Sequence, residues 1–202
     1  MNDMAKERAR REPVVPLVEI ENFQGEMRGM AERAIERSGR VPNQARAMAN
    51  HPVLGPIYRR FFEDLFRDSQ LPQELRFLIR YKVSTLNLCL YCSAHQINYM
   101  TKLGIDRDKI SNIAASDTHP AFSNRERVAL AIAEAVTLDA ANIPDSLIEE
   151  FRAQFSAQEM VEVTVVSGAM GFMNKVNDAL RIPVEDEAID LVGQGVDSDQ
   201  FT

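Results

Sequence analysis

The two cysteines of the chain lie three residues apart, and a histidine follows them at the same spacing. Cys89, Cys92 and His95 form the pattern C-x-x-C-x-x-H within the segment NLCLYCSAHQ (87–96). Thiols at this spacing can close a short disulfide and reopen it, and the thiolate is the reactive form. Residues three apart on a helix also face each other. The pattern is therefore typical of a redox dithiol, with a histidine one turn further on to take up or return a proton.

Zinc and haem are alternatives that the spacing disfavours. A structural zinc site needs four ligands, but Cys89 and His95 lie six positions apart, which is about 120° around a helix. Haem attachment needs a histidine directly after the second cysteine, where this chain has Ser93. We expect no metal and no cofactor. Two buried thiols beside a core histidine remain the non-redox alternative.

The segment around the thiols contains no acidic residue. The chain has 30 Asp and Glu, yet residues 75–105 contain none, where about four or five would be expected. The same window holds four basic residues, namely Arg76, Arg80, Lys82 and Lys102. A helix that starts near Asn87 would add a dipole that favours negative charge at its first turn. We expect a positive field at the thiols, which lowers a thiol pKa.

Helices are predicted to position these groups. Apolar residues recur with helical spacing from Val53 to Phe66, and residues 73–103 contain no Gly or Pro before Gly104 supplies a stop. Because such a stretch is long for one globular helix, we expect a break near Asn87, with its side chain capping the second helix.

Two capping boxes predict further helices. Ser123 with Glu126 and Ser156 with Glu159 begin segments that we expect to be helical over 124–138 and 157–180. A shorter helix is expected near 145–153. The segment 157–180 is apolar nearly all round, which is typical of a central buried helix. The chain is predicted to be all-α, and a faint likeness between 71–105 and 122–182 suggests two lobes from a duplicated unit.

Composition favours one globular domain without nucleic-acid or membrane partners. The chain has 202 residues, of which 45% are hydrophobic and 26% charged. No apolar run approaches the ~20 residues that span a bilayer, and no basic face carries interleaved aromatic residues. The N-terminus lacks the apolar centre of a secretory signal. We therefore expect a cytoplasmic protein with reduced thiols.

Charge is concentrated at the two ends. The formal net charge is −7, and six acidic residues with no basic residue follow Arg181, so residues 1–181 sum to −1. We expect a flexible N-terminal segment over 1–15, a helical domain over 16–184 and a flexible acidic tail over 185–202. The basic head (Lys6, Arg8, Arg10 and Arg11) and the tail are expected to be solvated.

Beyond these patterns, the chain resembles a known family. LPQELRFLIRYKVSTLNLCLYCSAHQINYMTKLGI (71–105) is similar to the core of the alkylhydroperoxidase D-like proteins, in the carboxymuconolactone decarboxylase superfamily. The segments 50–66, 122–138 and 155–185 follow the pattern of its peroxidase-related members. The resemblance implies an all-α helical bundle, a homo-oligomer (trimer, dimer or hexamer) and a thiol site at the start of a helix.

The resemblance also implies an activity and its residues. Cys92 would attack a hydroperoxide, Cys89 would resolve the sulfenic acid as a disulfide, and His95 would belong to the proton relay. An external dithiol would then reduce the disulfide. The expected function is that of an antioxidant enzyme that reduces alkyl hydroperoxides.

Two positions depart from the family pattern. His95 comes one residue early, so Gln96 stands where the histidine is expected. The relay glutamate twelve residues before the first cysteine is Phe77 here, and Glu74 lies almost one turn away as a substitute.

Two other functions remain open. One is a non-redox decarboxylase-like enzyme for a small carboxylic acid or lactone, with Arg76 or Arg80 binding the carboxylate. The other is a non-catalytic oligomeric redox sensor. Three further polar residues, Arg127, Asn174 and Asn177, are candidates for an interface or the pocket, although ordinary helix surface is the expected position.

Overall fold

The computed structural model describes residues 3–192, and that range is helical without a strand, as predicted. The α-helices are α1 (Asp3–Ala9), α2 (Gly25–Ser38), α3 (Asn43–Met48), α4 (Leu54–Arg67), α5 (Gln73–Leu86), α6 (Leu90–Lys102), α7 (Arg107–Ser111), α8 (Asn124–Asp139), α9 (Asp145–Gln154) and α10 (Ala157–Ala179). Short 3-10 turns occur at η1 (Ile20–Asn22), η2 (Ile113–Ala115) and η3 (Asp186–Leu191).

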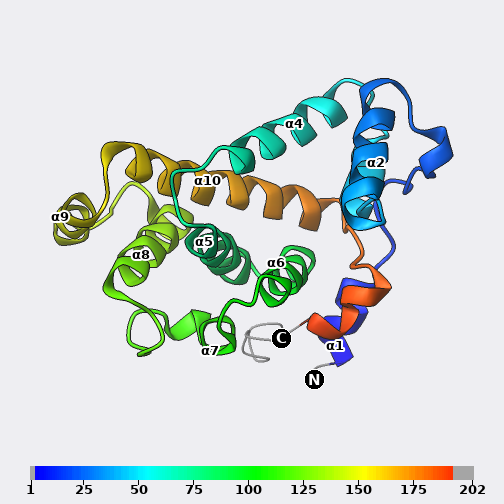
Figure 1. Cartoon of the computed structure of the whole chain (residues 1–202). Helices are drawn as coiled ribbons and strands as arrows, with labels where there is room; N and C mark the ends of the chain where they lie inside the picture. The colour runs from blue at the N-terminus through cyan, green and yellow to red at the C-terminus, as the bar shows by residue number, and fades with distance from the viewer. Residues whose placement is uncertain (1–2, 193–202) are drawn as a thin grey trace.

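Helix α5 forms the centre of the bundle. It packs against α6, α8 and α10, and α8 also packs against α10 (Figure 1). Leu78, Ile79, Tyr81 and Val83 of α5 are completely buried. Both helix pairs, α5–α6 and α8–α10, contribute to one hydrophobic cluster, so they share a single core. The suggested duplication of a helical unit stays a prediction.

The local helix signals are confirmed, with one exception. Both capping boxes form, at Ser123 with Glu126 and at Ser156 with Glu159. The long stretch breaks where expected, but Asn87 does not cap α6. It follows the end of α5, and its amide donates to the Val83 carbonyl at 3.0 Å and to Asn174 Oδ1 at 3.0 Å. The side chain therefore reaches back over α5 and across to α10.

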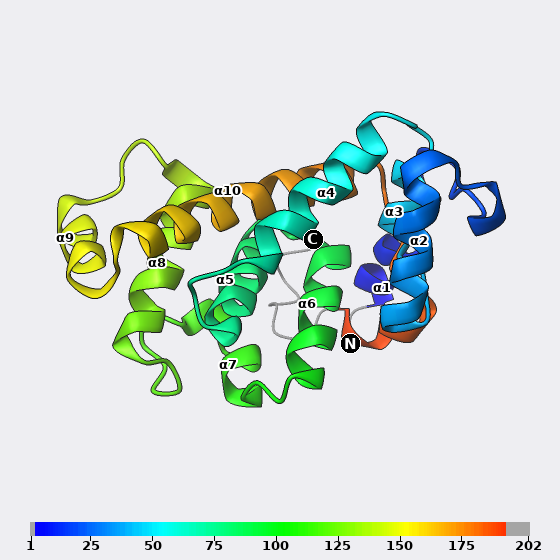
Figure 2. The same cartoon turned by 45° about the horizontal axis from the view of Figure 1, so that its top comes forward.

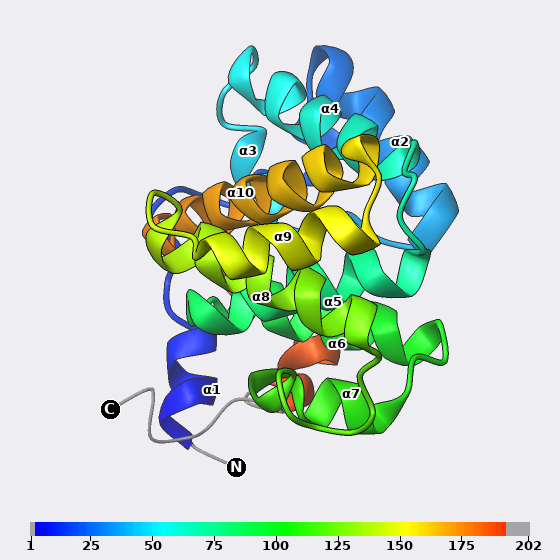
Figure 3. The same ribbon diagram turned by 90° about the vertical axis from the view of Figure 1, so that its left-hand side faces the viewer.

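The prediction that residues 157–180 form a central buried helix is wrong for one face of α10. Val161, Val165 and Phe172 are 63%, 42% and 51% exposed. Helices α8 and α9 cover the first part of α10 and α4 crosses above it (Figure 3), which leaves a strip of the helix open. A helix with apolar residues on nearly all of its faces therefore need not be buried on all of them.

An outer layer of helices lies against another side of α10. Tyr58 and Phe62 of α4 pack against Ala169 of α10, whereas Ile57 and Phe61 of the same helix are 49% and 45% exposed. Helices α2 and α3 bury a separate small apolar cluster beside α4 (Figure 2). This layer supplies one wall of the site described below.

The described ends of the chain are packed, in contrast to the flexible ends that were expected. Ala5 and Ala9 of α1 and Ala188 and Val192 near η3 belong to the main core. The Ala9 carbonyl accepts a hydrogen bond from the Val184 amide at 2.9 Å. Figure 1 shows η3 beside α1. The packed structure therefore continues past residue 184, because apolar residues lie among the acids there. Residues 193–202 of the expected tail lie outside the described residues.

Charge also joins the two ends within one chain. Lys6 of the basic head pairs with Asp190 of the acidic tail at 2.7 Å. The expectation that head and tail are separately solvated is wrong for this pair. Among the described residues, no helix is both long enough and apolar enough to cross a bilayer.

Candidate active site

The start of α6 brings the two thiols together. Leu88 has a φ of 54°, a left-handed conformation that is uncommon for a residue with a side chain. This turn places Cys89 at the N-cap of α6 and Cys92 in its first turn. Both cysteines are reduced and buried, and their sulfurs lie 2.9 Å apart. The predicted dithiol at a helix start is therefore present in the geometry.

A cavity of about 500 Å³ lies on one side of Cys92. Its lining residues come from α4, α5, α6 and α10 and include Cys92, His95, Gln96, Phe77, Arg80 and Asn177. Cys89 does not line it and is completely buried behind Cys92. A small molecule in the cavity would therefore meet the sulfur of Cys92 and not that of Cys89.

Asn177 of α10 donates a hydrogen bond to the sulfur of Cys92 at 3.2 Å. Its Oδ1 atom accepts from Gln44 Nε2 at 2.8 Å, which fixes the orientation of the amide. Asn174 and Asn177 are completely or almost completely buried, so the expectation of ordinary helix surface is wrong for both. Two amides three positions apart on an apolar helix were the signal that could have found them.

Arg127 has a structural role away from the thiols. Its guanidinium donates to the carbonyls of Asp117, His119 and Phe122 at 2.6, 2.8 and 3.0 Å. It therefore holds the loop before α8 and does not line the cavity.

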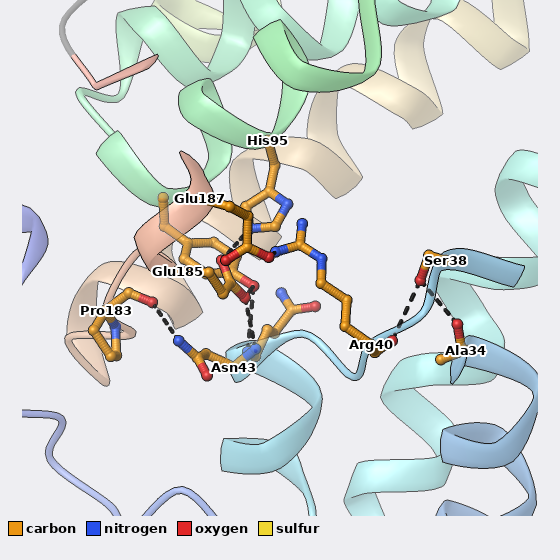
Figure 4. A network of polar contacts seen from close by, with 10 residues as sticks. Ala34, Ser38, Arg40, Asn43, His95, Pro183, Glu185 and Glu187 are labelled. Carbon is orange, nitrogen blue, oxygen red and sulfur yellow. Dashed lines mark hydrogen bonds and ion pairs between the residues drawn. The ribbon is translucent and has the colours of Figure 1, made fainter. Parts of the chain in front are cut away.

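His95 forms a hydrogen bond with Glu185, a residue from the expected tail. His95 Nε2 lies 2.7 Å from Glu185 Oε2, and the two side chains are only 8% and 10% exposed. The backbone N–H of Asn43 donates to the other carboxylate oxygen at 2.8 Å, and the Asn43 amide binds the Pro183 carbonyl at 3.0 Å (Figure 4). Glu187 next to it pairs instead with Arg40 (Figure 4). No local signal in the sequence singles out Glu185.

The contacts of Glu185 keep its carboxylate ionised. Burial raises the pKa of Glu185, but the hydrogen bond and charge of His95 and the N–H of Asn43 outweigh burial and bring the pKa down to about 2. The Tyr91 hydroxyl donates to Glu185 Oε1 at 3.2 Å. Burial, followed by the charge of Glu185, raises the pKa of Tyr91, so its hydroxyl stays a donor. A carboxylate, a tyrosine and a histidine thus form one network at the cavity.

Asp178 lies on the other side of the dithiol and is hydrogen-bonded to Cys89. Burial raises the pKa of Asp178 to about 6, although Cys89, Arg8 and Arg11 act in the opposite direction. Burial also raises the pKa of Cys89, together with the hydrogen bond that Cys89 donates to Cys92 and the charge of Asp178. Cys89 is therefore held as a thiol, beside a carboxyl group that can exchange a proton near neutral pH.

Of the two departures from the family pattern, the loss of the relay glutamate at position 77 is not compensated by Glu74. Phe77 packs at the cavity wall, where its ring lies 4.9 Å from the Arg80 guanidinium. Glu74 does not reach the thiols, because it pairs with Lys109 at 2.7 Å. The acid nearest to His95 is Glu185 instead.

The expected positive field is only partly present. Lys82 is neutralised by Glu134 at 2.7 Å, and Glu185 and Asp178 bring acids to the dithiol from outside the acid-free window. Arg80 remains, as a cation in the cavity that contains Cys92.

Comparison with known proteins matches part of the chain to one protein family. Residues 52–135 match the carboxymuconolactone decarboxylase family. The uncharacterized protein YnjA of Escherichia coli K12 is 28% identical over 117 residues, which are 58% of this chain and 64% of YnjA. The similarity therefore spans less than two thirds of that relative.

Two solved structures have the same fold over nearly their whole length. One is the alkylhydroperoxidase AhpD core of an uncharacterized peroxidase-related protein from Ralstonia eutropha JMP134, with a TM-score of 0.79, 18% identity and coverage of 91% of this chain and 98% of that one. The other is a variant of the debrominase Bmp8 in complex with 2,3,4-tribromopyrrole, with a TM-score of 0.77, 21% identity and coverage of 95% and 98%. At these identities the likeness shows a common fold.

Proposed function

We propose that this chain, of which residues 52–135 match the carboxymuconolactone decarboxylase family, is a thiol-dependent enzyme that reduces hydroperoxides through Cys92 and Cys89. One observation carries this proposal. Cys92 lines a cavity, and its sulfur lies 2.9 Å from that of Cys89, which does not line the cavity and is completely buried. An attacking thiol must be accessible to the substrate, and a resolving thiol must lie close to the attacking one; this arrangement meets both requirements.

The first step oxidises Cys92. Its thiolate attacks the distal oxygen of a hydroperoxide in the cavity, an S–O bond forms and the O–O bond breaks. The helix start and the Asn177 amide stabilise the thiolate. The alkoxide leaves and takes a proton from His95, whose ring Glu185 holds in place through a hydrogen bond. Gln96 presents a buried Oε1 without a hydrogen-bond partner among residues 3–192, and this acceptor suits the O–H of a hydroperoxide.

The second step forms the disulfide. Cys89 attacks the sulfur of the Cys92 sulfenic acid, the S–S bond forms, the S–O bond breaks and the oxygen leaves as water. Asp178 takes the proton of Cys89, for which a pKa of about 6 is suited. Two thiols and ROOH thus give a disulfide, ROH and water. An external dithiol returns the two electrons by thiol–disulfide exchange.

The experiment follows disulfide formation in the reduced protein. Wild type with excess cumene hydroperoxide is expected to form the Cys89–Cys92 disulfide. Cys89→Ser should stop at a sulfenic acid that dimedone traps, and Cys92→Ser should not react. Mass spectrometry distinguishes these products. If wild type forms no disulfide under excess hydroperoxide, the proposed function is wrong.

Debromination is a second candidate, favoured by the fold shared with the debrominase Bmp8. A dithiol can supply two electrons to a carbon–bromine bond, which yields C–H, bromide and the disulfide. Bromide release from a brominated pyrrole by the reduced protein would support it. Turnover of a lactone by the Cys89→Ser, Cys92→Ser double variant would instead favour a non-redox decarboxylase-like enzyme. Disulfide formation without catalytic turnover in the presence of a dithiol would favour a redox sensor.

A further inference from the structure

Arg80 is a cation in the cavity without an anionic partner among the described residues. It extends from α5 among the aromatic side chains, with its guanidinium 4.0 Å from the centre of the Phe66 ring and 4.9 Å from that of Phe77. Its Nε atom is buried and has no hydrogen-bond partner in the described part of the chain. Within residues 3–192, Arg80 forms no ion pair.

The other arginines around Arg80 have partners. Arg59 pairs with Glu63 at 2.9 Å, and Arg67 pairs with Asp64 at 2.8 Å. Arg76 donates to the Phe66 carbonyl at 2.8 Å. The Nε atoms of Arg59 and Arg76 are also buried without a hydrogen-bond partner in the described part of the chain. Each of these two guanidinium groups is held at another nitrogen, whereas Arg80 has no ion pair within residues 3–192.

An unpaired guanidinium is costly to hold away from water. Burial lowers the pKa of Arg80 to about 10, even though Tyr99 and Cys92 act in the opposite direction. The two rings offset part of this cost through cation–π contacts. They offer no hydrogen-bond acceptor, however, so the N–H donors of Arg80 are available for a ligand that enters the cavity.

We propose that Arg80 binds a carboxylate of the substrate, and that the preferred oxidant is an organic hydroperoxide with a carboxylate on an aromatic or otherwise apolar skeleton. This inference rests on the proposed function, since Cys92 lines the same cavity as Arg80. Guanidinium groups bind carboxylates through two parallel, charge-assisted hydrogen bonds. The apolar skeleton fits the remaining wall, which is formed largely by aromatic side chains, namely Tyr58, Phe62, Phe66, Phe77, Tyr91 and Tyr99.

Kinetics with a matched pair of substrates test this inference. Cumene hydroperoxide and its para-carboxylated analogue differ only in the anionic group. Wild type should show a kcat/KM at least about tenfold higher for the carboxylated compound. Arg80→Gln should lose this preference, so that its kcat/KM values for the two compounds become equal within about threefold, whatever the change in the absolute rate. Arg80→Lys should keep part of the preference, because it keeps the charge but not the fork of donors.

Arg67→Gln is the matched control, because Arg67 also lines the cavity but pairs with Asp64 and Asp68. It should keep the preference of wild type. Arg80→Gln should fold, since no acidic partner among the described residues loses its ion pair. A preference that survives in Arg80→Gln, or equal kcat/KM values in wild type, would overturn the inference.

A binding measurement separates this inference from the proposed reaction. Calorimetry on Cys92→Ser protein, which cannot turn over, should detect benzoate and should show at least about tenfold weaker binding when Arg80→Gln is added. Loss of benzoate binding in that variant, together with an inert wild type, would reject the peroxidase reaction and retain the anion site. Benzoate binding that is unchanged by Arg80→Gln would reject the anion site, whatever the kinetics.

Discussion

His95 Nε2 lies 2.7 Å from Glu185 Oε2, although the two residues are 90 positions apart in the chain. The pair is shielded from solvent, and Tyr91 and the Asn43 backbone complete the hydrogen bonds of the carboxylate. A carboxylate hydrogen-bonded to one ring nitrogen fixes the orientation of a histidine and the tautomer of its neutral form. We propose that Glu185 serves the proton relay in place of the residue at position 77, which is a phenylalanine.

Replacing Glu185 by glutamine is expected to slow oxidation of the dithiol. Without the carboxylate, the His95 ring loses the group that orients it towards the leaving alkoxide, so the rate should fall by about 10- to 100-fold at neutral pH. Stopped-flow measurement of disulfide formation with cumene hydroperoxide gives the rate. Glu187→Gln is the matched control, because that side chain is 57% exposed and pairs with Arg40. An unchanged rate in folded Glu185→Gln protein would exclude this role.

Acid should destabilise wild type more than Glu185→Gln. The pKa of Glu185 is about 2 in the folded protein against 4.5 in the unfolded reference, so the unfolded state binds more protons between these values. The stabilisation is therefore complete above pH ~4.5 and is lost as the pH falls towards ~2, with a total of about 2 to 3 kcal/mol. Urea unfolding from pH 6 to pH 2.5 measures it. Glu187→Gln should follow wild type, and equal acid sensitivity in Glu185→Gln would contradict the assignment.

Asp178 should have the opposite effect to Glu185 on how stability depends on pH. Burial raises its folded-state pKa from 3.8 to about 6, so the folded state binds more protons in this window and stability falls as the pH rises through it. Asp178→Asn should therefore gain stability over wild type between pH 4 and pH 7, by about 1 to 2 kcal/mol after allowance for solvent at this half-buried group. Urea unfolding at pH 4, 5.5 and 7 tests this. Asp186→Asn, at an exposed position, should show no such trend, and a constant difference for Asp178→Asn would refute the prediction.

Asn177→Ala is expected to reduce the reactivity of Cys92. The amide donates to its sulfur at 3.2 Å, and loss of a hydrogen bond to a charged group costs about 1.5 to 3 kcal/mol, or roughly tenfold or more in rate. Iodoacetamide alkylation of Cys92 in a Cys89→Ser background is the measurement. Asn174→Ala is the control, because Asn174 is equally buried but binds Ser84 and Asn87. Equal alkylation rates in the two variants would show that the amide does not stabilise the thiolate.

The sequence by itself determined the helices and the placement of the thiols. Capping boxes, the stop at Gly104 and the break after α5 act within about one helical turn, so they can be identified without knowledge of the fold. For the same reason, Cys89 and Cys92 could be assigned to a helix start, since their spacing is a local property. The match of 71–105 to a family extended this to an all-α bundle and to an order of the two thiols.

Only the tertiary structure decided the surroundings of the dithiol. Asn177 and Glu185 reach Cys92 and His95 from 85 and 90 positions away, and no local pattern specifies contacts across such distances. The acid-free window predicted a positive field, but Glu134 neutralises Lys82, while Arg80 stays unpaired within residues 3–192. Charge pairing depends on which helices pack together, and packing is set by the burial of apolar faces over the whole chain. The segment NLCLYCSAHQ therefore supplies the thiols, whereas residues distant in the chain supply the groups that we propose to move their protons.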